Sequence, residues 1–98
     1  MMLKKLLDKI EELITVAHSF GISIGFIGQD PDDDFDLDYT EDLALDGNKL
    51  CYNKRMIDLN DASGFYIEET DDGQIDTINI QIKDVVNYGI TNLDLIAW

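Results

Sequence analysis

Helical periodicity is confined to the first fifth of the chain, and this confinement restricts the folds that the chain can adopt. Apolar residues recur there at steps of three and four positions, and charged residues lie off that stripe. This pattern is typical of an amphipathic helix that covers a sheet. We expect the helix to end at Gly21, because glycine readily adopts the left-handed conformation found after helices. The stripe consists of Leu3, Leu6, Leu7, Ile10, Leu13, Ile14 and Ala17.

The rest of the chain predicts short strands separated by turns. Residues 22–27 are almost entirely apolar and predict a buried strand. Residues 35–39 alternate apolar and acidic side chains, which predicts a half-buried strand with an acidic outer face. Residues 43–52 and residues 65–82 predict hairpins, of which the first is expected to turn at Asp46-Gly47.

The last third of the chain adds a turn and a short helix to this pattern. Residues 61–64 predict a turn, and Asp84 and Gly89 are expected to bound a helix over residues 85–88. Residues 93–98 fit either a last strand or a helical turn. We therefore predict a single domain, residues 1–98, with an α+β fold. Its N-terminal amphipathic helix is expected to pack on one antiparallel β-sheet of about 4–6 strands.

Charge gives the clearest indication of function. The chain carries 21 acidic residues against 7 lysines and arginines, a formal net charge of −14. Seven cations are too few to neutralise phosphates and release their counterions. Direct binding to nucleic acid is therefore excluded. Docking on an anionic membrane is disfavoured for the same reason, and we expect no membrane partner.

The acidic residues gather in two segments that contain no cation. Residues 30–42 hold eight carboxylates, and four more flank the turn of the hairpin over residues 65–82. Carboxylates two positions apart on a strand lie about 6.8 Å apart on one face. Such a row is similar in spacing to the phosphates of one nucleic-acid strand, so it can occupy the basic channel of another protein. The predicted partner-binding residues are Asp32, Asp33, Asp34, Asp36, Asp38, Glu41, Asp42, Glu68, Glu69, Asp71 and Asp72.

These features predict a small acidic binding protein without catalytic activity. It would block a basic surface of a partner by mimicking nucleic acid, and the partner would be a nucleic-acid-binding protein or a nuclease. In charge and length, the chain is similar to the DNA-mimic inhibitors that phages use against restriction or CRISPR nucleases, and to bacterial toxin-immunity proteins. No motif carries this similarity. The competing interpretation is that the acidity serves solubility alone.

Residues 30–41 also resemble the calcium-binding loop of an EF-hand. Four aspartates fall at loop positions 1, 3, 5 and 9, and a glutamate falls at position 12. Phe35 stands at position 6, where a glycine normally makes the sharp bend, and the flanking residues predict strands. The alternative function is therefore a calcium-responsive module, and no other cofactor is expected. The candidate ligands are Asp30, Asp32, Asp34, Asp38 and Glu41.

Other classes of function have less support. His18 and Cys51 are the only histidine and the only cysteine, and a thiol within a predicted strand is more typical of a packed core than of a nucleophile. We therefore expect no enzyme. A single cysteine forms no internal disulfide, which suits a cytoplasmic protein. In a third interpretation, the apolar end that closes with Trp98 docks on a second copy of the chain or on a partner, so that the protein is a structural or assembly subunit, or a homodimer.

Overall fold

The computed structural model describes residues 3–30, 32, 35–40 and 42–97, without the side chains at positions 35, 36, 38 and 97. The predicted helix is confirmed as α1, Leu3–Phe20. Its apolar stripe enters the core, where Leu6, Ile10 and Leu13 are fully buried. Gly21 ends the helix with a φ of 63°, and the amide of Ile22 donates to the carbonyl of Ala17 at 3.0 Å.

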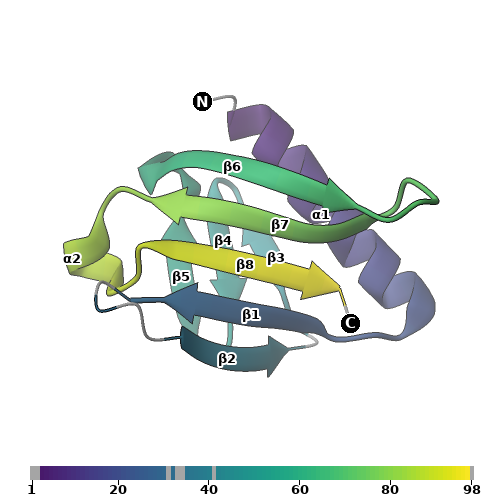
Figure 1. Cartoon of the computed structure of the whole chain (residues 1–98), viewed down its shortest axis with the longest axis horizontal. Coiled ribbons are helices and arrows are strands. Elements are labelled where there is room, and N and C mark those ends of the chain that lie inside the picture. The colour runs from purple at the N-terminus through teal and green to yellow at the C-terminus, as the bar shows by residue number, and fades with distance from the viewer. Residues whose placement is uncertain (1–2, 31, 33–34, 41, 98) are drawn as a thin grey trace.

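The largest unit of the fold is a five-stranded antiparallel sheet (Figure 1). The last strand of the chain, β8, lies between β1 and β7, so the spatial order is β2-β1-β8-β7-β6. The open choice for residues 93–98 is thereby decided in favour of a strand, although Trp98 lies outside the described residues. The strands are β1 (Ile24–Gln29), β2 (Phe35–Thr40), β6 (Ala62–Glu69), β7 (Ile75–Ile82) and β8 (Asn92–Ala97).

The chain between β2 and β6 forms a separate three-stranded sheet. Its strands are β3 (Ala44–Asp46), β4 (Lys49–Tyr52) and β5 (Arg55–Asp58), and a 3₁₀ turn, η1 (Leu59–Asp61), follows. The α+β class and the helix packed on an antiparallel sheet of about 4–6 strands are confirmed, and the small three-stranded sheet is an addition that the sequence did not predict. The sequence did not indicate the turn at Asn53-Lys54, which has positive φ at both residues and adds β5 to the β3–β4 hairpin.

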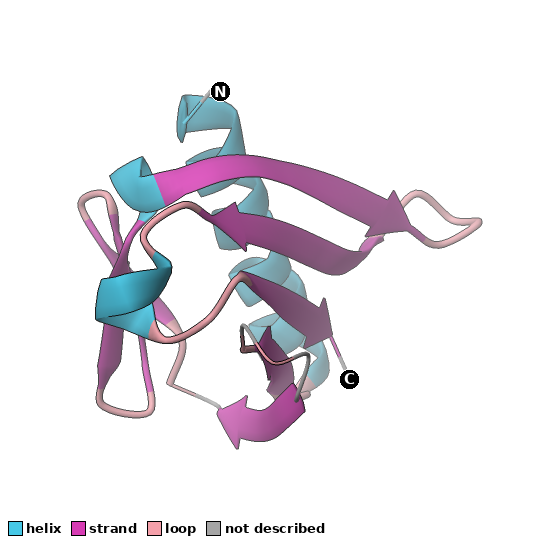
Figure 2. Ribbon diagram, turned by 60° about the vertical axis from the view of Figure 1, so that its left-hand side comes forward, coloured by secondary structure: helices cyan, strands magenta, loops and turns pink. Residues whose placement is uncertain are grey.

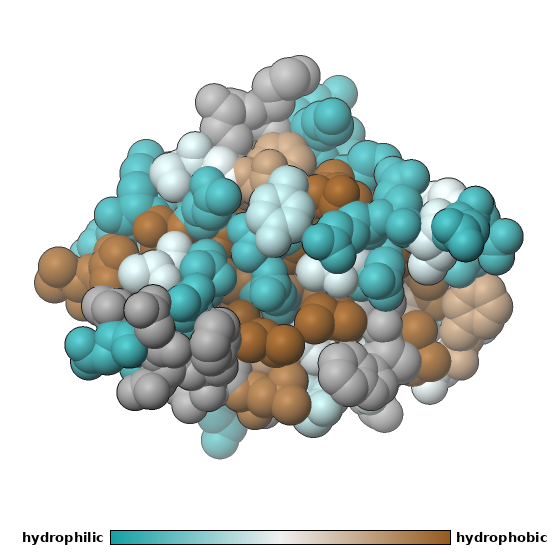
Figure 3. All heavy atoms as spheres, viewed as in Figure 1, coloured by the Kyte–Doolittle hydropathy of each residue, from teal (hydrophilic) through white to brown (hydrophobic). Residues whose placement is uncertain are grey.

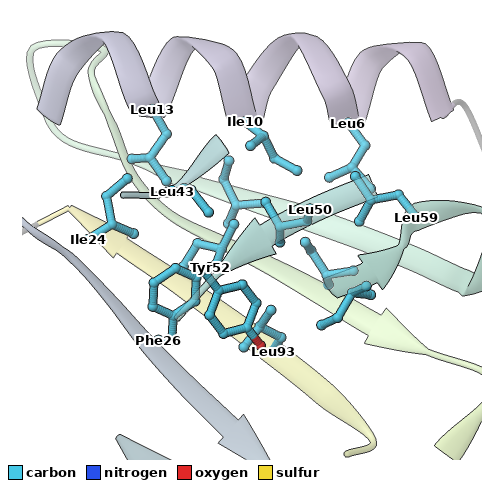
Figure 4. Packing of buried hydrophobic residues seen from close by; sticks show 14 of the residues in the cluster. Leu6, Ile10, Leu13, Ile24, Phe26, Leu43, Leu50, Tyr52, Leu59 and Leu93 are labelled. Carbon is cyan, nitrogen blue, oxygen red and sulfur yellow. The ribbon is translucent and has the colours of Figure 1, made fainter. Parts of the chain in front are cut away.

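One core joins these elements on a single face of the large sheet (Figure 4). Leu6, Ile10 and Leu13 of α1 point away from the helix into this core, where Leu50 of β4 and Leu59 lie next to them. The rings of Phe26 in β1 and Tyr52 in β4 stack with centroids 4.0 Å apart and an interplanar angle of 10°. The helix and the small sheet therefore together cover that face of the large sheet.

Two predicted turns are wrong in detail. The β3–β4 hairpin turns at Gly47 and Asn48, because Asp46 is already paired with Lys49. Positive φ at the first central residue only, Gly47, makes this a type II′ arrangement. Residues 61–64 are not a turn, because β6 begins at Ala62. A break in the pairing register between Ala62 and Gly64 gives this segment its irregularity instead.

The short C-terminal helix is confirmed as α2, Val85–Tyr88. The carboxylate of Asp84 accepts from the amide of Asn87, and Gly89 ends the helix with a φ of 70°. The Tyr88 hydroxyl donates to Asp61 Oδ2 at 2.7 Å and accepts from the amide of Asp58 at 3.2 Å. The hydrogen bond to Asp61, together with partial burial, raises the pKa of Tyr88 because ionisation would remove the donated proton. Tyr88 thus ties α2 to the end of the small sheet.

We predict that Leu50→Ala lowers the free energy of unfolding by about 2–5 kcal/mol, because it leaves a cavity where α1, β4 and the large sheet meet. Urea denaturation measures this loss. The matched control is Met56→Ala on the same small sheet, whose side chain is 53% exposed. The control is expected to change the free energy of unfolding by no more than about 0.5 kcal/mol. Equal losses in the two variants would contradict the shared core.

We predict that Tyr88→Phe lowers the free energy of unfolding by about 1–2 kcal/mol at neutral pH, because Asp61 loses a hydrogen-bond donor. Because the folded pKa of Tyr88 is raised, its contribution is fully present below the unfolded value of about 10 and is lost as the pH rises through the folded pKa. The difference between wild type and variant should therefore shrink above about pH 10. Urea denaturation across this range, with Tyr66→Phe as control, tests the prediction. A difference that stays constant would refute it.

Candidate functional site

The strand in the acidic segment is confirmed, but Leu37 and Tyr39 lie on the opposite face of the sheet from the one predicted. In the register of β1 and β2, Leu37 is opposite Ile27, and Thr40 is opposite the buried Ile24. Directly opposed residues share a face of the sheet. Thr40 is accordingly on the core side and is 8% exposed, whereas Leu37 and Tyr39 are 53% and 46% exposed on the other side. The long-range pairing with β1, which alternation alone does not specify, decides this outcome.

Two predicted partner-binding residues of the first segment have described side chains, and both are exposed. The amide of Asp32 donates to Asp30 Oδ1, and the amide of Asp42 donates to Thr40 Oγ1, each at 2.9 Å. One of these local side-chain-to-backbone bonds lies before β2 and the other follows it. Asp33, Asp34 and Glu41 lie outside the described residues, and only the backbone of Asp36 and Asp38 is described.

The second acidic segment forms the end of the β6–β7 hairpin, which projects beyond the rest of the molecule (Figures 1 and 2). Gly73 turns the chain with a φ of 80°, and the amide of Thr70 donates to the carbonyl of Gln74 at 2.8 Å. Asp76 of β7 adds a further exposed carboxylate that the sequence analysis did not single out. The predicted residues here are all exposed: Glu68, Glu69, Asp71 and Asp72.

The two acidic segments do not form one cluster. β2 and β6 are the opposite edges of the large sheet, with three strands between them. Four interstrand spacings separate the edges by about 19 Å. The carboxylates therefore border the same sheet from two sides, an arrangement that depends on strand order and that the sequence alone did not reveal.

Positive charge is separated from the large sheet. None of its five strands contains a lysine or an arginine. Three of the seven cations are on α1, and three are on the small sheet or its β4–β5 turn; Lys83 follows β7. Over the described part of the chain, the only salt bridge joins Lys9 Nζ and Glu12 Oε2 at 3.3 Å, on the surface of α1. The negative charge is therefore not neutralised by internal ion pairs among these residues.

The proposed calcium loop is preceded by a strand instead of a helix, and half of the loop is itself a strand. β1 precedes it, and β2 takes up residues 35–40, which would be loop positions 6 to 11. Within the described residues, no three or more His, Cys, Asp or Glu side chains are grouped so as to hold a metal ion. Asp34 and Glu41 lie outside those residues, as does the side chain of Asp38, so calcium binding stays a prediction.

The only histidine and the only cysteine lie on different elements. His18 is exposed near the end of α1, and Cys51 is half-buried in β4. None of the hydrogen bonds found in the described parts of the chain joins the two side chains.

Neither described helix is both long and apolar enough to cross a membrane.

We predict that the melting temperature rises by a few degrees when sodium chloride is increased from about 10 mM to about 150 mM. Salt screens the repulsion between exposed carboxylates that lack internal cations. Differential scanning calorimetry measures the rise. Calcium chloride at matched ionic strength is the parallel arm, because only a bound ion would raise the melting temperature further. A melting temperature indifferent to sodium chloride would contradict the self-repulsion.

Comparison with known proteins found no relative of this chain. The chain matches no protein-family model, no curated protein and no solved structure. Its distinguishing feature is a five-stranded sheet without cations, bordered at both edges by exposed carboxylates.

Proposed function

We propose that this protein is a non-catalytic acidic protein that binds the basic surface of another protein and blocks it. The observation that carries the proposal is the separation of charge across the large sheet. Its strands contain no cation, and its edges carry exposed carboxylates such as Asp42 and Glu68. A partner with the opposite charge would be attracted over a long range and would associate quickly.

The partner that fits this surface best is a protein that itself binds nucleic acid. Such proteins present clustered lysine and arginine side chains to neutralise phosphates. Carboxylates held on strands and on an ordered hairpin turn offer fixed negative charges to the same side chains, so the chain would compete with nucleic acid for them. It would act in the cytoplasm as a nucleic-acid mimic, and nucleases are the class of partner that such a protein would inhibit.

The first test is retention of a partner from bacterial lysate on the immobilised protein, followed by elution with a salt gradient. We expect a nucleic-acid-binding protein to elute as salt rises, since an electrostatic complex weakens with ionic strength. DNA or RNA should then compete with the chain for the purified partner. Failure of nucleic acid to compete would overturn the mimic, and retention of no protein at low salt would overturn the binding function itself.

We predict that reversing three carboxylates at the hairpin end weakens binding to that partner by about tenfold or more. The variant carries Glu68→Lys, Glu69→Lys and Asp71→Lys, all at exposed positions. Its matched control reverses the same number of exposed carboxylates on α1: Asp8→Lys, Glu11→Lys and Glu12→Lys.

Both triple variants change the net charge equally, so titration calorimetry separates a local contact from an effect of total charge. We expect the α1 control to bind within a few fold of wild type. Equal losses would mean that total charge alone drives association, and an unaffected hairpin variant would remove this segment from the contact.

A further inference from the structure

One face of the large sheet is covered by no described element. α1 and the small sheet both lie behind it in the view of Figure 1, and the opposite face is open to the viewer. The pairing registers define one row of side chains across this open face, with one residue from each strand. The row is Leu37, Ile27, Asp94, Asn79 and Tyr66.

The open face displays apolar and aromatic side chains. Leu37 and Tyr39 of β2 and Tyr66 of β6, which is 49% exposed, are three of the six large hydrophobic residues exposed in the described chain. Ile27 and Ile96 lie between them and are half-buried. On this side of the molecule, Figure 3 shows hydrophobic patches interspersed with polar ones. Tyrosine and aliphatic side chains held on rigid strands are the kind of residues that supply binding energy at protein interfaces.

Two pairs of polar side chains on this face are hydrogen-bonded to each other. Asn79 Nδ2 donates to Asp94 Oδ1 at 2.6 Å, and Asn92 Nδ2 donates to Gln29 Oε1 at 2.8 Å. These bonds link β7 to β8 and β8 to β1. A partner can therefore cover the face without leaving these amides unsatisfied, and the side chains need little reordering on binding.

Charge determines what can cover the face. Asp94 and Glu68 are on it and no cation is, while further exposed carboxylates border both edges. A second copy of the chain would bring together two molecules with a net charge of −14 each, which repel one another. Apolar side chains next to carboxylates, with Asp94 at the middle of the face, are instead complementary to an apolar anchor surrounded by lysine and arginine side chains.

We propose that the open face of the five-stranded sheet is the docking surface, and that its partner is a protein presenting an aromatic or aliphatic anchor within a basic patch. The proposal rests on the proposed function and refines it, because it assigns affinity to the apolar side chains of the face and steering to the carboxylates on and around it. If total charge alone drove binding, the protein would bind a flexible basic peptide as tightly as a basic surface that carries an apolar anchor.

The test uses two short synthetic peptides with the same number of lysines. In one peptide the spacers are glycines, and in the other two glycines are replaced by tryptophan. We expect the tryptophan peptide to bind about tenfold more tightly at the same ionic strength. Nuclear magnetic resonance of the isotope-labelled chain should place its shift changes on the strands of the large sheet. Leu37→Ala and Tyr66→Ala should each reduce the tryptophan advantage, whereas Met56→Ala, equally exposed on β5, should retain it.

The outcomes separate this inference from the function on which it rests. Shift changes concentrated on α1 and the small sheet, or equal affinity for the two peptides, would overturn the docking face and leave an acidic binding protein. Absence of binding by either peptide at low salt would overturn both. Sedimentation that shows a dimer disrupted by Leu37→Ala would also overturn the inference, because the face would then be covered by a second copy.

Discussion

The structure depends on the constraint that its apolar core lies on one face of the large sheet. α1 and the small sheet together supply the side chains that cover this face, and the contacts of Leu50 and of the stacked Phe26 and Tyr52 join the layers. The other described helix, α2, has four residues and buries none of them. Among the described elements nothing remains to cover the second face. The side chains that the strands place on this second face are consequently exposed to solvent or to a partner.

The register between β1 and β2 decides what the edge of the open face presents. A shift of one residue would exchange the two faces of β2, moving Leu37 and Tyr39 into the core side and Thr40 out of it. Hydrophobic burial alone would favour that shifted register, because it would hide two large side chains. The observed register instead buries Thr40, whose hydroxyl accepts a hydrogen bond from Asp42. The exposure of Leu37 and Tyr39 forgoes this burial, and a partner that covers the open face would bury both side chains in the complex.

Features encoded by neighbouring residues could be predicted from the sequence, and features that depend on long-range pairing could not. The stripe of α1, the caps of α2 at Asp84 and Gly89, and the β6–β7 hairpin all follow from spacing and turn chemistry within a few positions. The second sheet, the place of β8 between β1 and β7, and the exposed face of β2 required knowledge of which strands pair. For the same reason, the acidic segments were recognised individually, but their positions at opposite edges and the cation-free sheet between them were not.

The carboxylates at the edges also oppose the association of two copies of the chain through their open, partly apolar sheets. β2 and β6 are edge strands, and edge strands can pair with strands of another molecule unless charge or irregularity prevents it. Glu68 and Glu69 end β6, Asp42 follows β2, and a register break lies near the start of β6. Like charge therefore opposes contact between two copies both at the edges and across the open face. The same charge attracts a basic partner, so a single distribution of carboxylates disfavours the wrong partner and favours the complementary one.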